Sequence, residues 1–432
     1  MSTSAVRSEQ RYALPDEFGT AEAPRRELQP VEARSNTAMT RSVLVTHPGL
    51  QHSHQLALAL HEKNLLQAFW SGVPVAQDGE ALPWWLPEHF RRRVRRVDIP
   101  AGLRVHPVRF QVLQQTSMRV NMGHPGDRLH RIFHGFDAWA AKRIVQLRPK
   151  VVVAYENAAY HTFAAAKSVG ARCILDAAAF HHKTRAEQLA PPYTPYTAEV
   201  NRRKDVEIAM ADLILTCSPL AADSYVANGV DRSRVKPLLL GADPKQVTPI
   251  TCMRKDGVPR FMFAGQLTLG KSIDLILAAF ARLHAEGFRY EVNFVGGLGD
   301  HELLAEVQKT PGAHYHPSVP QSQLFELMAT ADCLLLPSRS DSFGMVVAEA
   351  MSCGTPALVS TQTGAKAVVE AFPESGWVVE PNGDALYNML RELVSDPARM
   401  QRARAPALVA SKEFTWERYR ARAARALQEY LQ

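Results

Sequence analysis

The chain has 432 residues, of which 46% are hydrophobic and 22% are charged, and this is the composition of an ordinary globular protein. This length allows about two or three domains. The formal net charge of +7 suits a partner that carries phosphate, although a solvated basic surface would give the same charge.

The cysteines and the apolar runs bear on the compartment of the protein. The five cysteines form no C-x-x-C pair, which argues against a zinc site or a redox pair. Most of them sit in apolar runs, as buried thiols do in a reducing compartment. No apolar run reaches the roughly 20 residues of a membrane span, and the N-terminus has no apolar signal-peptide core. We therefore expect a cytoplasmic protein.

Residues 1–40 are polar, mixed in charge and without periodicity, so we predict a disordered tail, in which Met39 is a second candidate start of translation. Residues 41–245 then alternate short β-branched runs with helical segments. Such alternation indicates a parallel sheet covered by helices on both faces. The predicted strands are residues 42–46, 150–154, 173–175 and 213–216, and the predicted helices are residues 54–63, 199–211 and a long helix from about 128.

A break rich in glycine and proline at residues 240–257 is the predicted linker to a second half. Residues 246–412 repeat the alternation, and residues 413–432 form a last amphipathic helix. The predicted fold class is α/β, with two doubly wound, Rossmann-like domains facing across a cleft, and ligands bind such sheets at the carboxyl ends of the strands. The predicted strands are residues 260–264, 292–295, 332–336 and 357–359, and the predicted helices include residues 272–284 and 321–330.

The segment PSRSDSFGMVVAEAMSCGTPALVS, residues 337–360, carries the most information. A strand and a polar loop precede a helix that Gly344 opens. Helix N-termini present free N–H groups and a partial positive charge. The N–H groups of Ser342, Phe343, Gly344 and Met345 are therefore expected at the mouth of a ligand site.

Two carboxylates belong to this segment. Asp341 lies just before the helix, and Glu349 follows after seven intervening residues. Carboxylates accept strongly from hydroxyl groups, so Asp341 suits a sugar, and Glu349 suits two vicinal hydroxyls such as those of a ribose. An N-cap aspartate followed by an ordinary helical glutamate is the alternative interpretation.

A second segment, FAGQLTLGKSIDLILAAF at residues 263–280, runs from a strand through Gly265 to a helix. Lys271 stands at the start of that helix, where an ammonium group is well placed to neutralise a leaving diphosphate. A solvated first-turn lysine is the alternative.

Together these segments resemble the donor site of glycosyltransferase family 4, whose motifs are P-S-x-x-E-x-F-G-x-x-x-x-E-A-M-A-x-G-x-P and G-R-L-x-x-x-K-G. The departures are Asp341 for glutamate, Gln266 for arginine and Ser272 for glycine. The resemblance implies the GT-B fold, with the last helix crossing back to the first domain, and retaining transfer of a hexosyl unit without a bound metal. It also implies that Gln266 and Lys271 hold the donor diphosphate, and Arg339 is a candidate to supply the charge that Gln266 lacks.

The resemblance assigns further contacts to strand ends. It places Gly296 beneath the nucleotide and the base against residues 317–319, which end at Val319. It places the turn at Gly49 near the sugar and phosphate. Asp176 and His181 have the spacing at which family members carry a histidine that supports the sugar hydroxyls or the acceptor, and a surface histidine pair is the alternative.

Aromatic and basic residues gather at residues 82–100, where Trp84 and Trp85 precede a basic run from Arg91 to Arg96. Such a patch suits peripheral contact with an anionic membrane on its inner face, or a polyanionic acceptor. A solvated helix that packs its tryptophans inward is the alternative.

The predicted function is transfer of a hexosyl unit from a UDP- or GDP-sugar to a polysaccharide or lipid-linked glycan, with no cofactor, no metal and no nucleic acid. The glycines at 296, 297 and 299 favour a nicotinamide-dependent oxidoreductase, but the full G-x-G-x-x-G is missing. A non-catalytic basic protein that binds glycan or nucleic acid, with a decayed donor site, is the third class.

Overall fold

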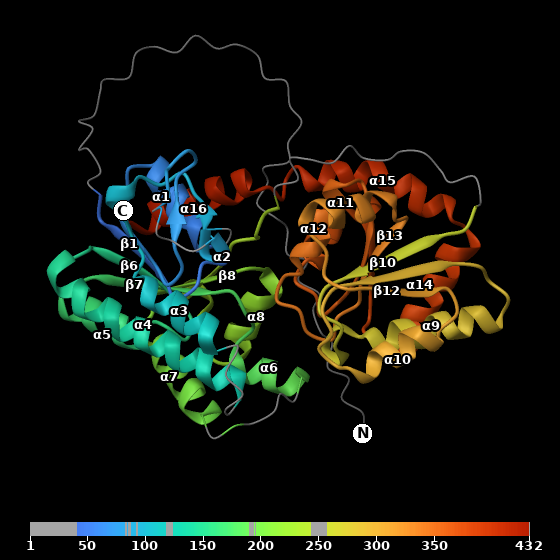
Figure 1. Cartoon of the computed structure of the whole chain (residues 1–432), viewed down its shortest axis with the longest axis horizontal. Helices are drawn as coiled ribbons and strands as arrows, with labels where there is room; N and C mark the ends of the chain where they lie inside the picture. The colour runs from blue at the N-terminus through green and yellow to red at the C-terminus, as the bar shows by residue number, and fades with distance from the viewer. Residues whose placement is uncertain are drawn as a thin grey trace, which may run out of the picture. The chain divides into compact units, whose positions relative to one another are not determined.

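Two parallel β-sheets carry the fold (Figure 1). The computed structural model describes residues 41–82, 84, 88–91, 94–117, 124–189, 194, 196–242 and 257–431. The predicted tail at residues 1–40, and the part of the predicted linker at residues 243–256, lie outside the described residues.

The first sheet has seven strands in the order β5-β2-β1-β6-β7-β8-β9. All of its pairs are parallel. Its central strands are apolar and buried on both faces, as the sequence pattern predicted. The strands are β1 (Val43–His47), β2 (Leu66–Ser71), β5 (Arg104–Val105), β6 (Val151–Tyr155), β7 (Arg172–Ala177), β8 (Leu213–Thr216) and β9 (Val235–Pro237), and β3 (Val75–Ala76) and β4 (Arg95–Arg96) form a separate pair.

Helices cover both faces of this sheet. One face carries the larger aromatic core, in which Phe110, Phe136 and Trp139 stack edge to face or tilted. The other face carries α1. The helices of this half are α1 (Ser53–Glu62), α2 (Glu88–Arg91), α3 (Val108–Ser117), α4 (Pro125–Leu147), α5 (Tyr160–Ser168), α6 (His182–Leu189), α7 (Thr197–Met210) and α8 (Pro219–Ala227).

The second sheet has six parallel strands in the order β12-β11-β10-β13-β14-β15. Its strands are β10 (Arg260–Ala264), β11 (Glu291–Val295), β12 (Ala313–His316), β13 (Cys333–Leu336), β14 (Ala357–Ser360) and β15 (Gly376–Val379). Its helices are α9 (Ile273–Ala285), α10 (Glu302–Lys309), α11 (Gln321–Thr330), α12 (Met345–Ser352), α13 (Lys366–Ala371), α14 (Gly383–Ser395) and α15 (Ala398–Ser411).

The last helix, α16 (Trp416–Leu431), returns to the first sheet. Its Arg420 reaches Gln55 at 2.9 Å and Glu62 at 3.0 Å, both of which belong to α1. Trp416 and Tyr419 lie against histidines of the first half. The expected crossing of the C-terminal helix is therefore present.

Strand order reverses at one point in each sheet, between β1 and β6 and between β10 and β13. The loops after these strands begin at His47, Tyr155, Ala264 and Leu336. Ligands of doubly wound sheets bind at such points. The topology therefore places both motif segments, which follow β10 and β13, at the predicted site.

Candidate functional site

The donor motif turns sharply between β13 and α12. Gly344 has φ of +87° and caps α12 without a side-chain hydrogen bond. A Cβ there would meet Leu336 Cδ2 at 2.7 Å, so the turn needs glycine. The Phe343 side chain is buried beneath the turn. Because no side chain caps α12, its first-turn N–H groups are open to an anionic group.

Lys271 and Asp341 meet across the second sheet. Lys271 ends a short 3-10 turn (Leu269–Lys271), and its Nζ lies 2.5 Å from Asp341 Oδ2. Both side chains are partly buried. The other carboxylate oxygen of Asp341 accepts the N–H of Phe343 at 3.2 Å. The structure thus brings together the residues predicted to hold the diphosphate and the sugar.

The nucleotide side of the predicted site is built on close backbone contacts. Gly296 has φ of +147°, and a Cβ there would collide with the carbonyl group of Gly265. The carbonyl group of Gly296 accepts the Tyr315 hydroxyl at 3.0 Å. Gln266 is exposed and lies beside Gly299. The partly exposed Val319 follows β12, the neighbour of β11 in the sheet.

Glu349 lies in the second turn of α12, behind Met345, the first residue of that helix. Burial raises the pKa of its carboxyl group above the ordinary value. Gln321 approaches it with Nε2 at 3.5 Å from Oε1. A ribose would therefore find a partly desolvated acceptor there.

Arg339 does not supply the charge that Gln266 lacks. Its two guanidinium nitrogens each lie 2.7 Å from a carboxylate oxygen of Asp274, and one of them also donates to the Leu269 carbonyl group. This bidentate pair fixes Arg339 against α9, so the suggestion that it compensates for Gln266 is wrong.

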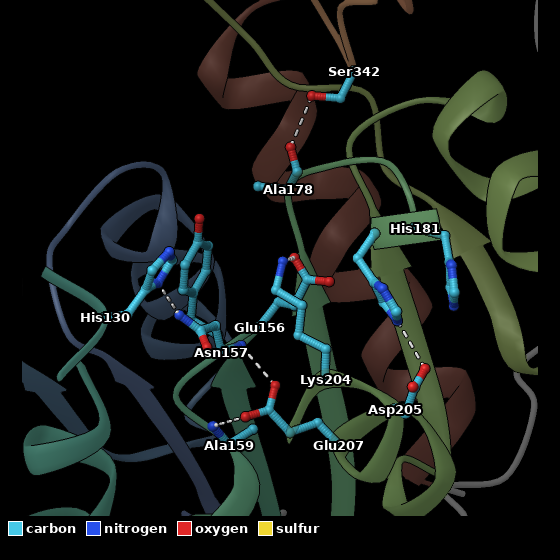
Figure 2. A network of polar contacts seen from close by, with 12 residues as sticks. His130, Glu156, Asn157, Ala159, Ala178, His181, Lys204, Asp205, Glu207 and Ser342 are labelled. Carbon is cyan, nitrogen blue, oxygen red and sulfur yellow. Dashed lines mark hydrogen bonds and ion pairs between the residues drawn. The ribbon is translucent and has the colours of Figure 1, made fainter. Parts of the chain in front are cut away.

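Ser342 joins the donor motif to the first half of the chain (Figure 2). Its Oγ donates to the Ala178 carbonyl group at 2.9 Å. Its own carbonyl group accepts from Ser218 Oγ at 2.6 Å. The loops after β7, β8 and β13 therefore meet at this serine.

The turn after β1 is fixed by a histidine. The Gly49 N–H donates to Nδ1 of the buried His47 at 2.8 Å, and burial lowers the pKa of His47 to about 3. Asp176 pairs with His52 Nε2 at 3.0 Å rather than with His181. Burial opposes protonation of His52, but Asp176 outweighs it, and the pKa of His52 is raised.

His181 follows β7 and is buried. Its N–H donates to Ser224 Oγ, and its ring stacks on that of His182 at 4.6 Å. Burial lowers the pKa of His181 to about 4, so it is neutral at physiological pH. Among the described residues, His181, His182 and Asp205 form a group whose ligand atoms lie within 4.8 Å of one another. These residue types could bind a metal ion, although His182 Nε2 already contacts Asp205 at 2.8 Å.

A polar network behind β6 was not predicted beyond Tyr155–Asn157 (Figure 2). Asn157 Nδ2 lies 2.6 Å from His130 Nδ1, and its backbone N–H donates to Glu207 Oε2 at 2.6 Å. Glu156 accepts from Lys204 Nζ at 3.2 Å and from the Tyr225 hydroxyl at 3.0 Å. Its residues come from α4, α7 and α8, and only their joint position at the end of β6 reveals it.

The two parallel sheets, the strand orders and the returning helix define the GT-B fold of glycosyltransferases. A sucrose-phosphate synthase from Thermosynechococcus elongatus superimposes with a TM-score of 0.60 at 17% identity, over 90% of this chain and 99% of that chain. HepE of Anabaena, solved in complex with UDP-glucose, superimposes with a TM-score of 0.59 at 15% identity, over 90% of this chain and 100% of that chain.

The sequence comparisons point to the same class. Residues 253–407 match the family model described as Glycosyl transferases group 1. D-inositol 3-phosphate glycosyltransferase 1 of Catenulispora acidiphila is 31% identical over 231 residues, 48% of this chain and 55% of that protein. The D-inositol 3-phosphate glycosyltransferase of Thermobifida fusca is 29% identical over 53% of this chain and 58% of that protein.

The chain thus spans about half the length of the curated relatives it matches. These matches support a glycosyltransferase and do not favour the oxidoreductase or the non-catalytic binding protein. Within the described residues, no helix has the length and apolarity that a membrane crossing requires.

Proposed function

We propose that this protein transfers a hexosyl unit from a UDP- or GDP-sugar to a polysaccharide or lipid-linked glycan, as a retaining enzyme of glycosyltransferase family 4 type. The observation that carries the proposal is the contact of 2.5 Å between Lys271 Nζ and Asp341 Oδ2 at the mouth of α12. It joins a cation suited to a diphosphate with a carboxylate suited to sugar hydroxyls.

The chemistry asks the site to stabilise a departing nucleoside diphosphate and a sugar ring that becomes positively charged. Lys271 and the uncapped N-terminus of α12 face the developing negative charge. Asp341 and Glu349 hold the sugar and the ribose in place. His181, neutral at physiological pH, supports the sugar hydroxyls or the acceptor. No residue is assigned as a nucleophile, and the reaction needs no resident metal ion.

The acceptor is held by the first half of the chain, and the enzyme works at the inner face of an anionic membrane. Trp84 supports this part of the proposal, because its side chain is 90% exposed rather than packed inward. Arg96 donates to the carbonyl groups of Gln77 and Glu80, so it also braces its own loop. Trp85 and the middle of the basic run lie outside the described residues.

The test is release of nucleoside diphosphate from a panel of nucleotide sugars by the purified protein, with and without EDTA. UDP-glucose comes first, because HepE of Anabaena was solved with it. The acceptors are a lipid extract and, because of the names of the curated relatives, D-inositol 3-phosphate. No release from any donor, together with no calorimetric binding of UDP or GDP, would overturn the proposal.

Lys271→Ala is the sharper variant. Because it removes the cation that faces the diphosphate, we expect turnover to fall by at least about 100-fold while the melting temperature stays unchanged. Lys309→Ala, an exposed lysine of α10, is the matched control and keeps full turnover. Unchanged turnover in Lys271→Ala would show that another group holds the diphosphate.

A further inference from the structure

A basic hollow lies between α3 and α4, apart from the donor site. Its volume is about 320 Å³, and the indole ring of Trp139 belongs to its wall. Gly135 helps to open it, because α4 has no side chain at that position. The residues that line it are Arg109, Gly135, Ala138, Trp139, Lys142 and Arg143.

Three of these residues are cations that meet no carboxylate among the described residues. The guanidinium group of Arg143 lies over the Trp139 ring at 4.3 Å, and that of Arg109 lies over the Phe110 ring at 4.7 Å. Lys142 is exposed. Aromatic rings hold the two arginines in place without neutralising them.

The sequence around the hollow lacks acidic residues. No Asp or Glu occurs between Asp98 and Asp127, or between Asp137 and Glu156. Asp137, which is closest in sequence to the lining residues of α4, is fully buried and pairs with Arg203 at 2.6 Å. The positive charge of this face is therefore not screened from within the protein, and it favours an anionic partner.

The same face exposes apolar side chains. Five of the eight large hydrophobic residues that are exposed in the described chain belong to β5, α3 or α4. Their exposed fractions range from 38% to 51%. On α3 three of them fall on the outer side of the helix, at spacings of four and five residues. The five are Val105, Val108, Val112, Leu113 and Val145.

We infer that the face formed by α3 and the second half of α4 docks on an anionic membrane surface, with lipid phosphate groups at Arg109, Lys142 and Arg143. Exposed valine and leucine side chains then enter the boundary between head groups and acyl chains. Polybasic surfaces gain affinity from each cation near anionic lipid. Nucleic acid would use the cations but would leave the apolar side chains in water.

The position of this face suits the proposed function, on which its purpose rests. Gln114 of α3 donates to the Pro48 carbonyl group at 2.8 Å, in the loop that follows β1. Docking through α3 would thus bring the loop at Gly49 close to the membrane. A lipid-linked acceptor could then be reached without leaving the bilayer. This contact is distinct from the one proposed at Trp84.

The test is sedimentation of the full chain with vesicles of phosphatidylcholine alone, or of phosphatidylcholine mixed with phosphatidylglycerol. We expect binding to the mixed vesicles only. The triple variant Arg109→Gln, Lys142→Gln and Arg143→Gln should bind them about 100-fold more weakly, since each cation contributes near the surface. Val112→Ser with Leu113→Ser should also weaken binding, because it removes the apolar contact.

The matched control is Arg289→Gln, Lys309→Gln and Lys412→Gln, three exposed cations of the second half. It changes the net charge equally and should bind as the wild type does. Equal loss in both triple variants, no binding by the wild type, or equal binding to DNA by the apolar double variant and the wild type without any vesicle defect would overturn the inference. Release of UDP on a soluble acceptor is measured in parallel, so a failure of membrane docking is separable from a failure of the proposed transferase activity.

Discussion

Lys271 and Asp341 neutralise each other while no donor is bound. Their contact of 2.5 Å lies in a partly buried setting, with 29% of the lysine side chain and 13% of the aspartate side chain exposed. A diphosphate must compete with this carboxylate for the ammonium group. The proposed site is therefore neutral at rest, and the donor exchanges one partner of Lys271 for another.

Asp341→Asn should separate the two proposed roles. Removal of the carboxylate frees Lys271 and removes a negative charge beside the diphosphate, so UDP should bind more tightly, by about 1 kcal/mol or roughly fivefold. Turnover of the nucleotide sugar should fall, because the amide is a weaker acceptor for a sugar hydroxyl. Calorimetry with UDP and a turnover assay measure the two effects. Weaker binding of UDP would mean that Asp341 orients Lys271 instead of competing with it.

Single residues could be predicted from the sequence where a local pattern encloses them. The turn at Gly344 and the position of Lys271 before α9 follow from strand, loop and helix signals within about 20 residues. The partner of Arg339 could not be predicted, because Asp274 lies 65 positions away in the chain. The same holds for His52 and Asp176, which are 124 positions apart.

At the scale of elements, long apolar strands were predicted and short edge strands were not. The prediction of β10 and α11 matches the structure at both ends. The strands β5 and β9 have two and three residues, and they are strands only because a neighbour supplies their hydrogen bonds. So little sequence contains no periodicity to detect. The first sheet consequently has three strands more than the four predicted.

The network at the end of β6 depends on one helix supporting another. Glu207 of α7 accepts three backbone N–H groups, those of Asn157 at 2.6 Å and of Ala159 and Tyr160 at 3.0 Å. It thereby caps the start of α5 from outside that helix. Helix N-termini need such acceptors, and here no local side chain provides one.

Glu207→Ala should destabilise the fold and loosen the loop that carries Asn157. Three buried N–H groups lose their acceptor, and each unsatisfied group costs about 1 kcal/mol or more, so we expect the free energy of unfolding to fall by about 3 kcal/mol. Urea denaturation measures this loss. The control is Glu199→Ala on the same helix, whose carboxylate pairs with Arg202 near the surface. An equal effect of both variants would contradict the capping role.

At the scale of the whole molecule, buried histidines tie stability to pH. Burial lowers the pKa of His47 to about 3 and those of His54, His130 and His181 to about 4. His52 has a raised pKa, and burial raises that of Glu207 to about 8. These two groups oppose the other four, because the folded state holds their protons more tightly than the unfolded chain does.

His47 gives this pH dependence its clearest test. Its pKa in the unfolded chain is about 6.5, so below that pH the unfolded state binds a proton that the folded state refuses. Acidification from about pH 6.5 therefore costs the folded state about 1.4 kcal/mol per pH unit from this residue, until the folded state itself binds the proton near pH 3.

The variant His47→Asn lacks this group, so its stability should fall less steeply than that of the wild type between about pH 7.5 and about pH 5.5. Urea denaturation at several pH values gives the slopes. His284→Gln, at an exposed position of α9, should keep the wild-type slope. If His47→Asn unfolds too readily for measurement, His181→Gln tests the same sign, because its pKa is lowered as well. A variant slope as steep as that of the wild type would mean that His47 is protonated in the folded protein.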